Sequence, residues 1–288
     1  MDASPSLLTS WALEPLQLVP TLLVALLYAR RARTLGRRGT PVPAWRRASF
    51  ALGVVLVLAS LASPLDAFAE QEFFFCHMLQ HVTLGDLAPL AFVAGLTGPI
   101  LRPVLALPVV DRLRVLAHPL VALPLWALNL FVWHVPALYE RAVLHDSVHA
   151  LQHVLFFTFG GLMWAAVLET LPGPAWFGTG AKLGYIVVVR LLESVLGNIF
   201  LWGGRVFYPV YDRPPERFGI SPLNDQSLAG AVMMIEGSLV TIGALAWLFL
   251  RLAREGELRQ ELLERGLDPR AVKRAVRYGR GHELSGPP

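Results

Sequence analysis

Histidines spaced four residues apart are the feature of this sequence with the clearest chemical meaning. His77 and His81 enclose the segment HMLQH, and His145, His149 and His153 recur every four residues in HDSVHALQH. Residues four apart lie on the same face of an α-helix, so each helix would present two imidazoles in one direction. A single helix supplies two ligands to one metal ion in this way. Both segments therefore predict metal-binding helices.

A further histidine, His134, ends an apolar run in the sequence WHVP. Pro136 should end that helix, which would let the His134 ring turn toward the bundle. We expect His145 to lie in a loop or in the first helical turn. Asp146, three residues before His149, should cap the helix or orient the His149 ring through a carboxylate–imidazole bond. The predicted metal ligands are His77, His81, His134, His149 and His153.

The residues by themselves leave the identity of the metal open. Imidazole is a suitable ligand for copper, zinc, iron and nickel. Sulfur from Met78 or Cys76 would favour Cu(I). On a helix, however, Met78 points about 100° away from His77, so packing is the alternative role for this side chain. Cys76 is the single cysteine of the chain, which excludes an intrachain disulfide and a zinc ribbon.

The elements that must position these histidines are membrane helices. The 288 residues are 55% hydrophobic and 16% charged, with a mean hydropathy of +0.52, whereas soluble domains carry roughly 25% charged residues. A membrane span needs about 20 mainly apolar residues. Seven windows qualify, which predicts an all-α polytopic membrane protein with seven transmembrane helices: 9–29, 47–66, 73–97, 115–134, 148–170, 181–202 and 226–250.

Charged residues in the loops predict the orientation. Basic residues cluster in the loop between the first two windows (Arg30, Arg31, Arg33, Arg37, Arg38, Arg46 and Arg47). Others follow windows three, five and seven, while the alternate loops are acidic or mixed. The positive-inside rule therefore places the N-terminus outside and the C-terminus in the cytoplasm. Residues 1–250 would form the membrane domain, and 251–288 a basic amphipathic cytoplasmic tail.

With this orientation, the five predicted ligands and His145 fall at the outer face, at similar depth. Only His118 and His282 fall elsewhere. Ionisable residues inside spans indicate function by default. Asp86 and Glu236 could each hydrogen bond to a metal ligand, relay protons or form a hydrogen bond between helices. Asp225 should cap the last helix. The basic residues occur in blocks between apolar runs, which argues for a membrane protein and against a nucleic-acid partner.

Three segments resemble the CtaG family of cytochrome c oxidase assembly factors: HMLQHVTLGDLAPLAFVAGLTGP, WHVPALYERAVLHDSVHALQHVLFFTFGGLMW and SPLNDQSLAGAVMMIEG. The resemblance covers about residues 70–250 and rests on the paired histidines together with the WHxP and DQ elements. It implies a bacterial seven-helix protein of the plasma membrane that assists maturation of a cytochrome oxidase through copper. It also implies that the five predicted ligands match histidine positions of the family.

Three functions remain open at this point. The first is a non-enzymatic assembly factor whose outer histidines hold copper and pass it on, with oxidase subunits or copper chaperones as partners. The second is a membrane zinc hydrolase, which would need an open position on the metal and a nearby carboxylate such as Asp86, Asp146 or Asp225. The third is a haem-binding electron carrier with axial histidines on facing helices. Five histidines exceed what one catalytic zinc or one haem requires, which favours the first.

Overall fold

The computed structural model describes residues 6, 10–11, 15–171, 173–212 and 218–285. All regular elements within these residues are helices, which confirms the all-α prediction. The chain divides into two units, each described by itself below. Unit one comprises Met1–Gly173 and Leu192–Glu236, and unit two comprises Pro174–Leu191 and Gly237–Pro288.

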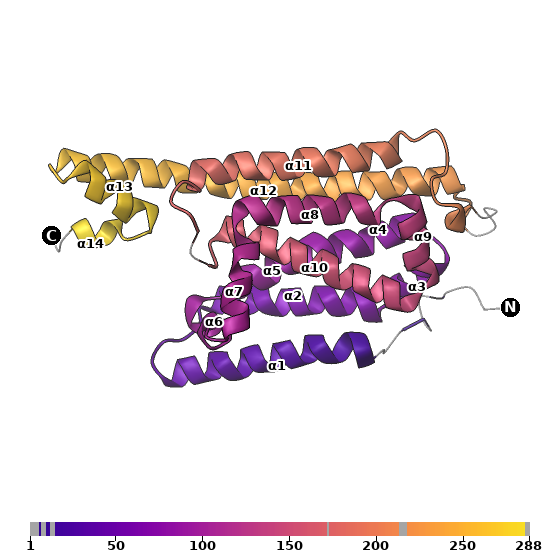
Figure 1. The fold of residues 1–288 in the computed structure, drawn as a ribbon, viewed down its shortest axis with the longest axis horizontal. Coiled ribbons are helices and arrows are strands. Elements are labelled where there is room, and N and C mark those ends of the chain that lie inside the picture. Colours follow the sequence, from indigo (N-terminus) through magenta and orange to yellow (C-terminus); the bar gives the residue numbers. More distant parts are fainter. Residues whose placement is uncertain (1–5, 7–9, 12–14, 172, 213–217, 286–288) are drawn as a thin grey trace. The chain divides into compact units, whose positions relative to one another are not determined.

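Unit one contains most of the helices (Figure 1). They are α1 (Pro15–Arg37), α2 (Ala44–Ala62), α3 (Pro64–Gln71), α4 (Phe74–Val82), the π-helical turn η1 (Thr83–Leu87), α5 (Ala88–Gly95), α6 (Gly98–Leu105), α7 (Pro108–Leu113), η2 (Arg114–Ala117), α8 (Pro119–Trp133), α9 (Pro136–Leu144), α10 (Asp146–Leu168) and η3 (Pro209–Tyr211). The end of α11 (Thr179–Leu201) and the start of α12 (Pro222–Glu264) complete it.

The centre of unit one is α10, which packs against α5, η1 and α8. Its approach to η1 is closest at Gly160, where an added Cβ would lie 1.9 Å from the carbonyl oxygen of Gly85. Only glycine therefore allows the two backbones to come this near, as small residues commonly do between membrane helices. This contact positions the two histidine-bearing helices, α4 and α10, relative to each other.

The variant Gly160→Ala is expected to lower the free energy of unfolding by ~1–3 kcal/mol, because the new methyl group overpacks the helix contact. Gly161→Ala is the matched control, since its Cβ would meet nothing within 4 Å. Denaturant or thermal unfolding in detergent measures both. Equal stability of the two variants would contradict the close contact.

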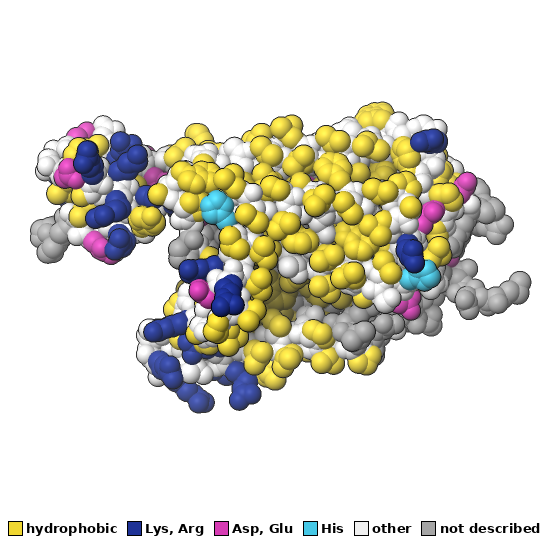
Figure 2. Space-filling view, in the orientation of Figure 1, with side chains coloured by type: hydrophobic (Ala, Val, Ile, Leu, Met, Phe, Trp, Pro, Cys, Tyr) yellow, Lys and Arg dark blue, Asp and Glu magenta, His cyan; other side chains and the backbone are white. Residues whose placement is uncertain are grey.

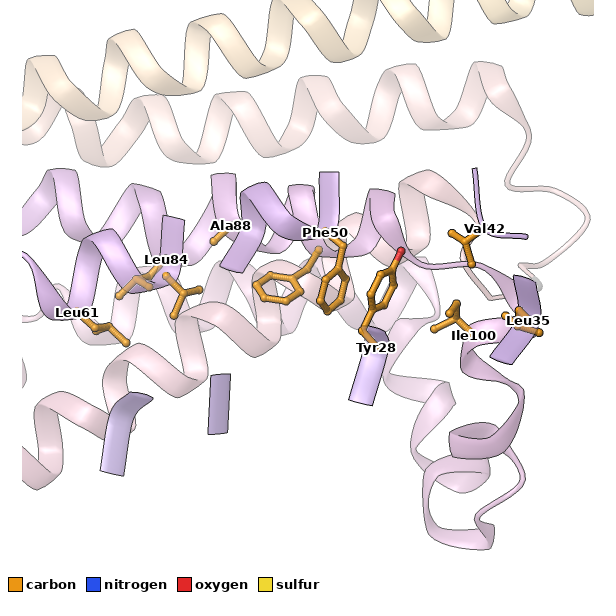
Figure 3. Packing of buried hydrophobic residues seen from close by; sticks show 10 residues of the cluster. Tyr28, Leu35, Val42, Phe50, Leu61, Leu84, Ala88 and Ile100 are labelled. Atoms are coloured by element: carbon orange, nitrogen blue, oxygen red, sulfur yellow. The ribbon is translucent and has the colours of Figure 1, made fainter. Parts of the chain in front are cut away.

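Helix α1 is attached to the bundle by aromatic packing. The rings of Tyr28 in α1 and Phe50 in α2 stack at a centroid distance of 3.7 Å (Figure 3). The Tyr28 hydroxyl donates to the carbonyl oxygen of Gly95 at 3.0 Å. Phe92 of α5 meets the Phe50 ring edge-on. This cluster holds α1, α2 and α5 together through contacts between residues that are far apart in the sequence.

The number of candidate membrane spans differs from the predicted seven. Among the described residues, four helices are long and apolar enough to cross a membrane: α2, α10, α11 and α12. Two bent pairs raise this number to six, namely Phe74–Gly95 with Gly98–Leu105, bent by 99°, and Pro108–Ala117 with Pro119–Trp133, bent by 77°. The first predicted window, 9–29, begins among residues outside the described ones, and its remainder lies in α1.

Surface composition agrees with a membrane environment. Figure 2 shows apolar side chains covering α8 and α10, and large hydrophobic residues such as Leu120, Leu128, Leu151 and Val154 are exposed there. Lys and Arg gather instead where α6, α7 and the end of α1 lie. Such contiguous apolar exposure is rare on soluble monomers, and the basic end is what the positive-inside rule expects of a cytoplasmic face.

Unit two contains Thr179–Leu191 of α11, α12 from Gly237 onward, α13 (Pro269–Arg277) and α14 (Gly281–Ser285). Helix α12 continues past position 250, the predicted end of the membrane domain, to Glu264. Helix α13 is amphipathic, as predicted for the tail. Its apolar residues Val272 and Val276 are buried with Leu262 of α12, which leaves basic residues such as Arg270 and Lys273 exposed.

Candidate metal centre

Helix α4 presents His77 and His81 on one buried face, as the i,i+4 spacing predicts. Its first turn is fixed by Asp225 of α12, whose carboxylate accepts the backbone N–H groups of Phe74 at 2.8 Å and Phe75 at 2.9 Å. A carboxylate at a helix N-terminus satisfies donors that have no partner within the helix and stabilises the helix dipole. Asp225 was predicted to cap its own helix, and its hydrogen bonds go to α4 instead.

Helix α10 presents His149 and His153, whose ring centroids are 4.1 Å apart. The His149 ring lies 5.0 Å from that of His77 on α4. One ligand atom from each of His77, His81 and His149 fits a group in which all three atoms lie within 4.8 Å of one another. The three residues are buried. Packing of α10 against α4 and η1 thus brings two histidines of α4 and one of α10 into a single cluster of three imidazoles.

The remaining two predicted ligands lie beside this triad. His153 is 5.6 Å from His81 between ring centroids. His134 ends α8, as expected from Pro136, and its ring centroid is 6.1 Å from that of His81. All five predicted histidines therefore share one buried layer. His145 is exposed at the start of α10, and His118 caps α8 by accepting the backbone N–H of Leu120.

Hydrogen bonds at Nδ1 direct the Nε2 atoms of three rings into the cluster. His134 Nδ1 lies 2.7 Å from the carbonyl oxygen of Leu130, and His149 Nδ1 lies 2.7 Å from a carboxylate oxygen of Glu70. Both oxygens accept only, so each Nδ1 carries a proton, and in the neutral imidazole Nε2 is then the atom with the free lone pair. Metal-binding histidines in proteins have this arrangement almost always.

His77 is oriented through a tyrosine. The Tyr211 hydroxyl donates to the carbonyl oxygen of Ala69 at 2.8 Å, which leaves its oxygen to accept the Nδ1–H of His77 at 3.0 Å. The His77 Nε2 lone pair then faces His81 Nε2 at 2.8 Å. Two lone pairs at this distance repel each other, so the contact requires a proton on His81 or a cation shared by the two rings. In the metal-free protein this contact is therefore a hydrogen bond donated by His81, and a cation bound between the two rings would take the place of its proton.

Several buried imidazole nitrogens lack a hydrogen-bond partner. Within the described chain, the Nε2 atoms of His134, His149 and His153 are buried and have no hydrogen-bond partner. A buried polar atom without a partner is costly. A cation held beside this layer would provide a partner for such lone pairs. The donor set therefore fits a metal that prefers imidazole.

Two residues near the histidines escaped sequence reasoning. Glu70 of α3 takes the role expected of Asp146, which is exposed at the start of α10. Tyr211 orients His77. Both lie more than 60 residues from the imidazole they contact, and no local pattern connects them to it. The only signal was composition, because Glu70 lies in an acidic segment with Asp66 and Glu72, and Tyr211 lies in the aromatic segment FYPVY.

A shell of buried tyrosines encloses the layer. The Tyr208 hydroxyl donates to the carbonyl oxygen of His134 at 2.8 Å. The Tyr139 ring stacks on that of Tyr208 at a centroid distance of 4.0 Å, and its centroid lies 5.1 Å from that of the His77 ring. Burial raises the pKa of both the Tyr139 and the Tyr208 phenol above the ordinary value. These groups therefore stay neutral and add no charge to the site at neutral pH.

Gln226, beside Asp225, holds the segment that carries Tyr208 and Tyr211. Its side-chain amide donates to the carbonyl oxygen of Arg205 at 2.9 Å, and its side-chain oxygen accepts the Phe207 N–H at 2.8 Å. The adjacent Asp and Gln thus fasten two different elements around the histidines. Met78 and Cys76 are buried outside the triad, and Cys76 packs with Phe68, Ala69 and Phe73.

Fold and site together define an all-helical protein, compatible with a multi-pass membrane protein, that encloses a cluster of buried imidazoles. The family described as cytochrome c oxidase caa3 assembly factor matches residues 26–255. The chain belongs to this family, as the resemblance indicated.

Two relatives are uncharacterized proteins of Mycobacterium bovis and Mycobacterium tuberculosis. Each is 23% identical over 270 residues, which cover 86% of this chain and 40% of the relative. The chain thus spans about 40% of the length of these curated relatives. No solved structure matches it.

Proposed function

We propose that this protein is a copper-binding assembly factor that holds a copper ion at the outer membrane face and passes it to a cytochrome c oxidase. The observation that carries the proposal is the triad of His77, His81 and His149, whose ligand atoms lie within 4.8 Å of one another. Imidazole suits copper, and membership of an oxidase assembly family supplies the context. Zinc is the alternative metal.

His134 and His153 complete the proposed ligand set. Each has a buried Nε2 without a hydrogen-bond partner among the described residues, and each ring lies near His81. A carrier must bind its cargo firmly and still release it. The layer offers more imidazoles than a single ion needs. The ion could therefore exchange its ligands one at a time and remain coordinated throughout.

The position of Glu70 supports exchange with the outside. Its side chain is 35% exposed, whereas that of His149, to which it is bonded, is 5% exposed. The Glu70–His149 pair therefore connects solvent with the buried triad. A copper donor or an oxidase subunit docking at α3 would meet this pair first.

The carboxylates argue against a hydrolase. Asp86 accepts a hydrogen bond from the Trp164 indole, and Asp225 is bonded to the N-terminus of α4. Asp146 is exposed. Two of the three residues on which the hydrolase alternative depended, Asp225 and Asp146, thus have another role or position, which supports a non-catalytic carrier.

Metal analysis of the detergent-purified protein, with an optical spectrum of the same sample, tests the proposal. We expect copper near one equivalent per chain. Zinc without copper would redirect the assignment to the hydrolase, and a Soret band would redirect it to a haem protein. Absence of any metal after reconstitution with Cu(I) would overturn it.

The proposed orientation places the histidine layer outside and the C-terminus in the cytoplasm. A cysteine substituted for Leu144, which is exposed at the end of α9, should react with a membrane-impermeant thiol reagent in intact cells. A cysteine substituted for Arg37, at the end of α1, should react only after lysis. Cys76 is buried, so background labelling should be low. The reverse pattern would overturn the orientation.

A further inference from the structure

A small cavity lies next to the histidine layer, within unit one. Its volume is about 50 Å³, and its mainly apolar lining includes His81 and His134 together with the acidic residues Asp86, Glu193 and Glu236. A water molecule needs roughly 10–15 Å³ of such space. The cavity therefore has room for a few waters, and these five side chains offer them hydrogen-bond partners.

The π-helical turn η1 places Asp86 in this cavity. Asp86 is 8% exposed, and the indole N–H of Trp164 donates to its carboxylate. The Asp86 side chain lines this cavity together with that of Glu236 on α12. Two carboxyl groups buried around one small cavity avoid the cost of two adjacent negative charges when one of them carries a proton. The pair therefore stores a proton within the helix bundle.

The imidazoles do not contact this pair directly. His81 Nδ1 and His134 Nε2 have no hydrogen-bond partner among the described residues, although both rings line the same cavity and are 4% and 7% exposed. Water in the cavity would bridge the gap. A chain of imidazole, water and carboxyl groups inside a membrane protein is the arrangement that proton relays use.

We propose that Asp86 and Glu236 form a proton-exchanging pair that compensates the charge of a cation bound by the histidines; this inference rests on the proposed function. When the cation enters, the O–H bond of the pair breaks, the proton leaves through the cavity water to the outside, and both electrons of the bond stay on the carboxylate. When the cation departs, a proton returns. The new carboxylate lowers the cost of a buried positive charge.

Infrared difference spectroscopy of the full-length protein in detergent tests this inference with Cu(I) as the added probe. The metal-free protein should show the C=O stretching band of a protonated carboxyl group. The band should vanish in Asp86→Asn, which keeps the shape and an oxygen for Trp164, and should shift in Glu236→Gln. Asp146→Asn, at an exposed carboxylate, is the control and should leave the band unchanged. Circular dichroism verifies that each variant is folded.

Addition of Cu(I) should remove the band from the parent protein and release about one proton per ion, a release that Asp86→Asn should largely lose. Absence of the band from the metal-free protein would overturn the proton-exchanging pair. Copper binding that leaves the band intact would also overturn it while leaving the proposed function in place. A band that is present and depends on Asp86, in a protein that binds no copper, would instead overturn the proposed function.

Discussion

A variant in which His77 and His149 are both replaced by alanine is expected to purify as a folded helical protein that has lost nearly all of its copper. One ligand would be lost from α4 and one from α10, which leaves only His81 of the triad. Loss of a group that merely supports a ligand costs 10–100-fold in metal affinity. The loss of two ligands should therefore exceed ~100-fold. Metal content per chain and competition with a Cu(I) chelator measure the effect.

His145→Ala is the matched control for this variant. His145 belongs to the same run of histidines as His149, yet it is exposed at the start of α10. Its removal should leave copper content unchanged. Near-stoichiometric copper in the double variant would show that the buried layer is not the metal centre. An equal loss in His145→Ala would point to binding by surface imidazoles instead.

Glu70→Gln should lower the affinity for copper by roughly 10–100-fold. The Glu70 carboxylate accepts the Nδ1–H of His149 at 2.7 Å, which fixes the tautomer that leaves Nε2 as the ligand and increases its basicity. Glutamine has the same shape but no charge, so the fold should persist. Chelator competition and the rate of copper release measure the change.

Asp146→Asn separates this role from a general effect of negative charge. Asp146 lies three residues before His149 and was the orienting carboxylate expected from the sequence. In the structure it is exposed, and Glu70 makes the bond. Its substitution should leave the affinity unchanged. A larger loss from Asp146→Asn than from Glu70→Gln would restore the expectation from the sequence.

The bent helices show where span prediction from hydropathy reached its limit. The windows 73–97 and 115–134 are mainly apolar, and the sequence suggested simple spans. Each largely coincides with one arm of a bent pair, and the bends of 99° and 77° lie near the end of the first window and near the start of the second. Apolar character reports which residues avoid water, whereas the direction of the chain after a proline or an extended residue depends on what packs beside it. Among the described residues the structure supports four to six spans, and the seventh stays a prediction.

The sequence by itself determined the helical class, the family and the shared face of each histidine pair. The reason is that 3.6-residue periodicity and apolar length are properties of a single helix. Only the tertiary structure decided that the two pairs meet, that His134 joins them, and that Glu70 and Tyr211 orient His149 and His77. These contacts join residues far apart in the chain. They arise from interhelical packing, such as the close approach of Gly160 to Gly85, which periodicity within one helix does not encode.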